Sequence, residues 1–181
     1  MGCVFILPAC ALVPYRGYVV DSETKAPVKD VVVFIEFIAP NSFLAEGRST
    51  VDASEGKTDE KGYFSVPDKG WSLNPWKMLF MSSDLTIFKS EYVPIQGTWS
   101  NLKDETYEPY ISKAKVVWKV EYGKPYIVLR KYKNLEEMVN DRTYHGIMKE
   151  TIQPGSDVKG ETWKFLGEEL NKEHKMLFPY K

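Results

Sequence analysis

The chain has 181 residues, with 24 Lys and Arg against 25 Asp and Glu, for a formal net charge of −1. This balance gives no overall field that would attract nucleic acid, so we expect no nucleic-acid partner. The length suits one domain with an extension better than two equal domains. An aromatic content of 14%, rich in Tyr and Trp, is typical of a β-sandwich.

The first fourteen residues, Met1 to Pro14, are almost wholly apolar. They are too short for a bilayer span, which needs about 20 residues, and they lack the basic start of a complete signal peptide. Three interpretations stay open. The segment is the end of a bacterial lipoprotein signal with Cys3 acylated (Cys10 fits less well), a eukaryotic acylation start, or an apolar strand or tail packed on the domain. Ile6 stands where the eukaryotic motif needs Ser or Thr.

We expect the first interpretation, because soluble proteins seldom leave a dozen apolar residues in water. A lipid on Cys3 would place the chain in the bacterial cell envelope, anchored on the periplasmic side of a membrane. Cys10 would then be a spare thiol, and a Cys3–Cys10 disulfide stays open as well, since two cysteines without a framework carry little information. Neither cysteine has the surroundings of a catalytic one.

The stretch from Tyr15 to Phe64 organises the domain. Tyr18 to Val20 favours a strand, and the polar residues up to Pro27 predict a turn. The β-branched run from Val31 to Ile38 predicts a strand buried on both faces. Asp59 and Gly62 then bracket a tight turn, in which glycine takes a positive φ, and a strand follows until Pro67.

Further strands are expected at 49–53, 77–82, 84–89, 92–93, 114–120 and 125–131, the last two joined by a hairpin turn at Gly123. The segment 96–112 reads as a long polar linker. About seven strands at irregular spacing indicate a β-sandwich.

Turn and strand residues of the chain match a known pattern at Gly17, Val19, Asp21, Thr24, Pro27, Val31, Val33, Thr58, Asp59, Gly62 and Phe64. With these residues the chain resembles the carboxypeptidase regulatory-like domain family. The resemblance covers roughly residues 15–132, and Tyr92 meets the Gly-Tyr motif of the family only in part, because Glu91 replaces its glycine. It implies a mainly β, transthyretin-like Greek-key sandwich that acts as an accessory or binding module and has no catalytic residues.

The sequence changes character after Tyr132. Asn134 is a good helix cap, with acidic residues in the turn after it. Apolar residues at 135, 138 and 139 predict one helix face up to the break at 153–156, and 159–177 predicts a second amphipathic helix. We therefore divide the chain into an apolar segment (1–14), a β-sandwich (15–133) and a C-terminal helical extension (134–181). The two helices are expected to pack on the sandwich rather than on a partner.

The chain contains no metal-binding, phosphate-binding or serine-hydrolase motif, so we expect no metal, no cofactor and no catalytic residue. Asp21, Asp59 and Glu60 could together hold calcium, although aspartates in such positions are typical of turns. A pocket formed by Asp141, His145 and a tyrosine would be the feature of an enzyme.

Three tryptophans fall in or beside predicted loops: Trp71, Trp76 and Trp99. If their rings lay on one surface they would form a carbohydrate-binding platform, but we expect them to be buried or half-buried in the domain. We expect a non-enzymatic interaction or structural module of a cell-envelope lipoprotein, whose partner is another envelope protein or a glycan. A carbohydrate-binding module that uses these tryptophans is the second hypothesis.

Overall fold

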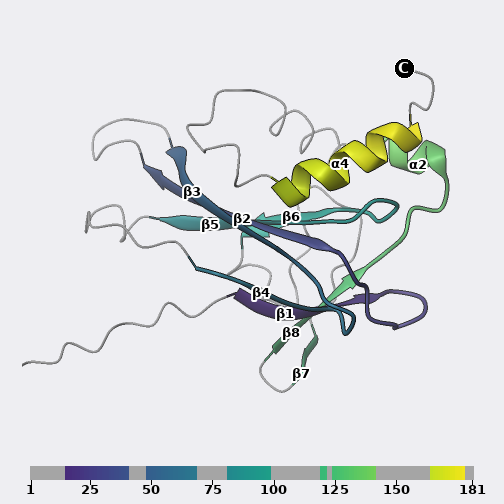
Figure 1. Ribbon diagram of the computed structural model, residues 1–181, viewed down its shortest axis with the longest axis horizontal. Coiled ribbons are helices and arrows are strands. Elements are labelled where there is room, and N and C mark those ends of the chain that lie inside the picture. The colour runs from purple at the N-terminus through teal and green to yellow at the C-terminus, as the bar shows by residue number, and fades with distance from the viewer. Residues whose placement is uncertain are drawn as a thin grey trace, which may run out of the picture.

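The computed structural model describes residues 15–40, 48–68, 81–98, 119–121, 124–141 and 164–177. These residues form the predicted mainly β, transthyretin-like Greek-key sandwich with a helical C-terminal extension, in which two four-stranded sheets have the orders β4-β1-β8-β7 and β3-β2-β5-β6 (Figure 1). The elements are β1 (Tyr15–Asp21), β2 (Val32–Pro40), β3 (Arg48–Lys57), β4 (Tyr63–Val66), β5 (Ser82–Phe88), β6 (Ile95–Thr98), β7 (Lys119–Glu121), β8 (Lys124–Leu129), α2 (Leu135–Val139) and α4 (Lys164–Leu177).

Strand β2 is buried on both faces, as its apolar run predicts. Val33, Ile35 and Phe37 belong to the core between the two sheets. Val32 and Phe34 belong to a second apolar cluster on the opposite face of the same sheet. Each of the five side chains is at most 1% exposed. The strand is therefore the shared wall of both apolar layers.

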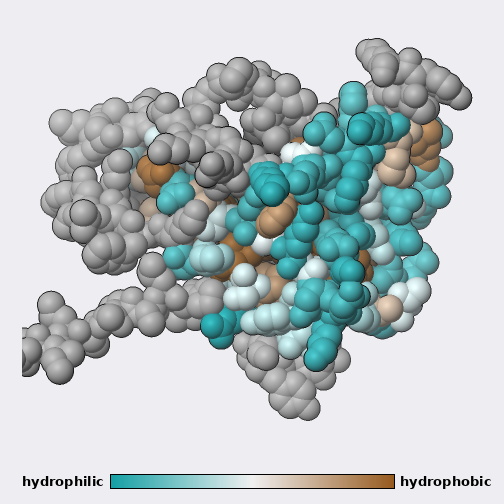
Figure 2. All heavy atoms as spheres, in the orientation of Figure 1, coloured by the Kyte–Doolittle hydropathy of each residue, from teal (hydrophilic) through white to brown (hydrophobic). Residues whose placement is uncertain are grey.

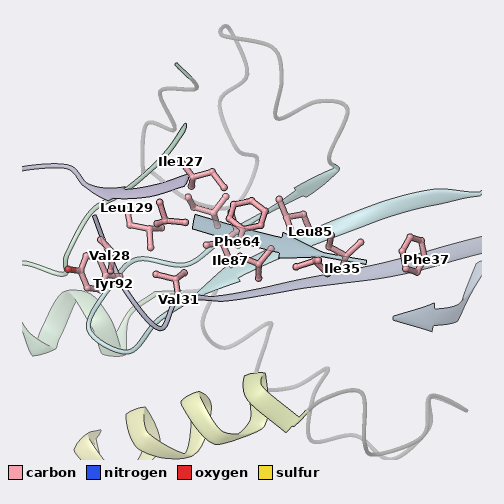
Figure 3. Close-up of a cluster of buried hydrophobic side chains, with 14 residues drawn as sticks. Val28, Val31, Ile35, Phe37, Phe64, Leu85, Ile87, Tyr92, Ile127 and Leu129 are labelled. Atoms are coloured by element: carbon pink, nitrogen blue, oxygen red, sulfur yellow. The ribbon is translucent and has the colours of Figure 1, made fainter. Parts of the chain in front are cut away.

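Side chains from both sheets fill the main core, as Figure 3 shows. Phe64, Ile127 and Leu129 come from the first sheet and meet Leu85 and Ile87 of the second. All five are almost completely buried. Burying side chains of this size stabilises a fold by about 1.5–3 kcal/mol each, so this layer is the principal source of the sandwich's stability.

One buried threonine joins the β1–β2 connection to the end of β3. The Thr58 hydroxyl donates to the Val28 carbonyl (2.7 Å) and accepts from the Val31 amide (2.9 Å). Its backbone exchanges further hydrogen bonds of 3.0 Å with Val31 and Asp30. The side chain is 3% exposed. Thr58 thus satisfies several polar groups that would otherwise be buried without partners.

The predicted turn between β3 and β4 is confirmed at Gly62. This residue has φ +69°, and a Cβ placed on it would lie 2.4 Å from the Val19 carbonyl oxygen. The Val19 amide donates to the Gly62 carbonyl at 2.8 Å. Only glycine fits this combination of positive φ and close approach to β1.

Helix α4 covers the outer face of the sheet β3-β2-β5-β6 (Figure 1). Leu166 and Leu170 pack with Phe34 and Phe88 of the sheet. The surface of the helix that faces the viewer in Figure 2 is mostly hydrophilic. The predicted amphipathic helix is thus confirmed over the described part, 164–177. Met176, an apolar residue near the end of this helix, is 48% exposed.

A carboxylate of the sheet caps this helix. Glu55 of β3 accepts from the amides of Phe165 (2.9 Å) and Leu166 (3.2 Å), at the helix end where unpaired N–H groups favour an anion. Burial raises the pKa of Glu55, and these two hydrogen bonds act against that rise. Lys57 adds an ion pair to Glu168 at 3.3 Å. The start of α4 is therefore held by polar contacts as well as by apolar packing.

The first predicted helix is correct at its start and wrong in its length. The Asn134 side chain accepts from the Glu137 amide, as expected of a cap, but α2 ends at Val139. Only Met138 of the predicted apolar face is buried, while Leu135 and Val139 are 59% and 43% exposed. One turn of helix offers only one position to the core.

A bidentate ion pair fixes α2 to the end of β8. The two nitrogens of the Arg130 guanidinium donate to Glu137 at 2.8 and 3.1 Å, and the Lys133 amide donates to it at 2.7 Å. The Arg130 bond, followed by the Lys133 amide, lowers the pKa of Glu137 to about 2. This geometry orients the short helix without a large apolar contact.

Two strand predictions need correction. The strand expected at 49–53 is twice as long, since β3 runs over ten residues from Arg48 to Lys57. Residues 96–98, expected to begin a linker, belong to β6, which pairs with β5. Both segments are rich in polar residues, and pairing with an apolar neighbour holds them as strands. The predicted β7–β8 hairpin is confirmed as an antiparallel pair. The strand expected at 77–82 lies mostly outside the described residues.

Glu91 has a positive φ of 72°, at the position where the resembled family has glycine. A left-handed conformation costs a residue with a Cβ about 1 kcal/mol, and the greater unfolded-state freedom of glycine cancels part of any gain. We therefore expect Glu91→Gly to raise the free energy of unfolding by a few tenths of a kcal/mol up to about 1 kcal/mol, measured by urea denaturation. Glu91→Ala is the matched control, because it removes the carboxylate but keeps the Cβ. If Ala stabilised the protein as much as Gly, charge rather than backbone strain would be the cause.

Candidate functional site

Three tyrosines form a row across the outer face of the sheet β4-β1-β8-β7. Tyr18 of β1 lies directly opposite Tyr63 of β4 in the antiparallel pair and opposite Tyr126 of β8 in the parallel pair. All three side chains are partly exposed. Successive side chains of a strand alternate between its two faces, so the buried Val19 and Ile127 put these tyrosines on the side away from the core.

The rings of this row pack against one another. The Tyr18 and Tyr126 rings are stacked, with centroids 5.1 Å apart and planes 17° apart. The Tyr63 ring is tilted by 52° relative to Tyr18 at 5.2 Å. A distance of 5.1 Å is too short for two nearly parallel rings to lie side by side in one plane, because their edges would clash. Tyr18 and Tyr126 therefore turn ring faces toward each other, as in an offset stack.

Residues on either side of the row extend the surface. The register places Arg16 opposite Ser65 on one side, and Val20 opposite Val128 on the other. Arg16 and Ser65 are exposed, and both valines are partly exposed. We call these seven residues the tyrosine face: Arg16, Tyr18, Val20, Tyr63, Ser65, Tyr126 and Val128. It combines a polar pair, an aromatic row and an apolar pair, a composition suited to binding another surface.

These tyrosines were not among the predicted site residues. Each stands in a predicted strand at a position that alternation turns outward, and that is the only signal the sequence carries. Their proximity depends on the register of two strand pairs, one of which joins the first strand of the domain in parallel to the last. A parallel pair joins strands that are distant in the chain.

The carboxylates considered for calcium are occupied by turn hydrogen bonds. Asp21 Oδ1 accepts from the amides of Glu23 and Thr24 at 2.9 Å and from the Thr24 hydroxyl at 3.1 Å. Asp59 Oδ1 accepts from the amides of Lys61 (2.8 Å) and Tyr63 (2.9 Å). Glu60 pairs with Lys29 at the surface. The turn interpretation of these acidic residues therefore accounts for their contacts.

The second oxygen of Asp21 binds a buried tyrosine. The Tyr92 hydroxyl donates to Asp21 Oδ2 at 3.2 Å. Burial, followed by the negative charge of Asp21, raises the pKa of Tyr92 to about 12. The hydrogen bond from the Thr24 amide is the largest cause of a lowered Asp21 pKa. This pair is thus a neutral phenol bound to a carboxylate, a structural tie between β1 and the segment before β6.

Asp141, which was considered as part of an enzyme pocket, forms a hydrogen bond with a tyrosine. The Tyr132 hydroxyl donates to Asp141 Oδ2 at 2.7 Å. Burial and this hydrogen bond raise the pKa of Tyr132, so it remains a neutral donor. His145, the third member of the expected constellation, lies outside the described residues. A small pocket of about 120 Å³ is lined by other residues, namely Tyr15, Phe37, Asp68, Met81, Ser82 and Ser83.

The other predicted site residues cannot be placed. Cys3, Cys10, Trp71, Trp76 and Trp99 all lie outside the described residues. Within the described ranges, no group of three or more His, Cys, Asp and Glu side chains could hold a metal ion. The helices in those ranges are also too short or too polar to cross a membrane.

No protein-family model matches the chain, and no curated protein matches it. Among solved structures, a pilus adhesin (RrgA) from Streptococcus pneumoniae is similar over 68% of this chain and 15% of its own, with 12% identity and a TM-score of 0.40. The 3-chlorocatechol 1,2-dioxygenase from Rhodococcus opacus 1CP is similar over 66% of this chain and 59% of its own, with 20% identity and a TM-score of 0.32. The chain spans less than two thirds of either protein.

Proposed function

We propose that this chain is a non-enzymatic interaction module of a cell-envelope lipoprotein, and that the tyrosine face is its contact surface for a partner protein. The observation that carries the proposal is the row of Tyr63, Tyr18 and Tyr126. It lies on the sheet away from α4, which covers the outer face of the other sheet. Tyrosine is enriched at protein interfaces, because it buries a large ring and offers a hydroxyl at its edge.

The ring geometry favours a protein partner over a sugar. A sugar platform needs ring faces that are open to the ligand, but the stack covers one face of Tyr18 and one face of Tyr126. A stacked pair offers its edges and hydroxyls, which suit hydrogen bonds with a protein backbone or polar side chains. The carbohydrate hypothesis therefore depends on Trp71, Trp76 and Trp99 rather than on this sheet.

The family hypothesis is supported by the roles of the motif residues. Thr58, Gly62 and Asp21 each make contacts at one end of the sandwich that few other residues could make. The positive φ of Glu91 gives a physical reason for a glycine at that position in other sequences. We therefore propose membership of the carboxypeptidase regulatory-like family.

The proposal of a non-enzymatic role depends on the carboxylates, which form hydrogen bonds and ion pairs within the fold. Asp21 and Asp59 accept turn amides, and Glu137 is fixed by Arg130. A catalytic acid or base must reach a substrate instead of being fully occupied by its own fold. An anchor on Cys3 would hold the sandwich near the membrane, because β1 begins at Tyr15.

The anchor is tested by Cys3→Ala in protein expressed with its native upstream region in a bacterial host. We expect the wild type to partition with membranes and to carry a diacyl or triacyl adduct in intact-mass spectra. Cys3→Ala should be unmodified and soluble, because the thioether linkage needs the sulfur. Cys10→Ala is the matched control and should behave as the wild type. An unmodified wild-type protein in the soluble fraction would contradict the lipoprotein proposal.

The contact surface is tested by placing a photoreactive benzophenone amino acid at Tyr126 in cells of that host. We expect a discrete cross-link to an envelope protein, reduced about tenfold or more by Tyr18→Ser, because interface tyrosines are often hot spots. The control position is Asn171, which is exposed on α4, and thermal melting checks that Tyr18→Ser is folded. Equal cross-linking from both positions would contradict the assignment of the surface. An adduct with glycan alone would favour the carbohydrate hypothesis.

A further inference from the structure

The carboxyl group of Glu173 in α4 is buried, and no hydrogen bond from the described residues replaces the water it has lost. Its exposed fraction is 0%. Within the part of the chain that the structure describes, neither of its carboxyl oxygens has a hydrogen-bond partner. An ionised carboxylate in such a place is strongly unfavourable, because it has lost its water and gained no donor. A protonated carboxyl avoids most of that penalty.

The acidic groups around Glu173 come from three elements. Glu169, one turn earlier in α4, is 3% exposed. It accepts from the Ser90 amide at 3.3 Å and from Lys172 Nζ at 2.7 Å. Asp141, at the end of α2, binds the Tyr132 hydroxyl. Glu91 stands in the turn before β6.

These surroundings keep a proton on Glu173. Burial raises the pKa of Glu173 to about 8. The negative charges of Glu169, Asp141 and Glu91 contribute in the same direction. The nearby Lys172 does not compensate for Glu173, because its ion pair is with Glu169. No group of acidic side chains in the described ranges is arranged to hold a metal ion, which would have been another way to balance the charge.

The position of Glu173 links its protonation to the packing of α4. Leu166 and Leu170 hold the first half of the helix on Phe34 and Phe88 of the sheet. Glu169, next to Leu170, and Glu173, one turn later, are the buried polar residues of the helix. Ser90 contacts Glu169 and, in the second half, the Met176 sulfur at 3.3 Å. After Leu170, the next apolar contact of the described helix with the sheet is the partly buried Leu177, so the buried carboxyl of Glu173 lies between the two apolar contacts.

We propose that Glu173 is a proton-dependent latch: α4 stays packed on the sheet while this carboxyl is protonated, and deprotonation releases the second half of the helix. In the released helix the carboxylate reaches water and regains its ordinary pKa. Between that value, 4.5, and about 8, the packed state binds one proton more than the released state. Packing therefore weakens as the pH rises through this window, by up to tenfold per pH unit, and the effect levels off above pH 8.

The test is hydrogen–deuterium exchange of the full chain at pH 6 and pH 9, corrected for the intrinsic exchange rate. We expect the protection of amides in the second half of α4 to fall at least tenfold more than that of β2 amides, which report global stability. Glu173→Gln keeps the shape of a protonated glutamate without the titration, so its α4 protection should not change with pH. Glu168→Gln is the matched control at an exposed position of the same helix. It removes the ion pair with Lys57 at the start of the helix, but the pH dependence of protection in the second half should follow the wild type.

Two results would contradict the proposal that protonation of Glu173 keeps α4 packed. The first is a Glu173→Gln variant whose α4 protection falls with pH as much as that of the wild type. The second needs no variant: carbon-13 labelling of the glutamate carboxyls follows the titration of Glu173 directly in the wild-type protein. A midpoint near the ordinary glutamate value would show that the carboxyl is already ionised at neutral pH, and the proposal would fail.

Discussion

The structure depends on the burial of β2 on both faces. Val33, Ile35 and Phe37 close the core between the sheets, and Val32 and Phe34 provide the surface on which α4 packs. The first four residues of the strand, 32–35, have no solvent face, so each must fit a neighbour on one side or the other. The helical extension is consequently part of the same packed unit as the sandwich.

This constraint divides the molecule into a covered side and an open side. The sheet that contains β2 has α4 over its outer face, with Glu55 capping the helix end. The other sheet carries the tyrosine face on its outer side. The proposed contact surface and the proposed latch therefore lie on opposite outer faces of the sandwich, and a change at Glu173 would act on the covered side alone.

Most acidic residues that the sequence offered for chemistry are used by the fold. Asp21 and Asp59 accept backbone amides in turns, and Asp141 accepts from the Tyr132 hydroxyl. Glu173, which was not a predicted site residue, has no such role and lies in the interior. Its spacing from Leu170 and Leu177 puts it on the side of α4 that packs on the sheet. Only the tertiary structure shows that no donor among the described residues reaches its carboxyl group.

Local features of the fold could be predicted from the sequence. The two-sided strand from Val31, the glycine turn at Gly62, the cap at Asn134 and the amphipathic pattern of α4 each depend on residues within a few positions of one another. Only the tertiary structure decided the length of β3, the presence of β6 and the meeting of Tyr18, Tyr63 and Tyr126. The physical reason is that strand pairing supplies hydrogen bonds from partners distant in the chain. Periodicity shows which face a side chain is on, but the register of the pairs decides which side chains become neighbours.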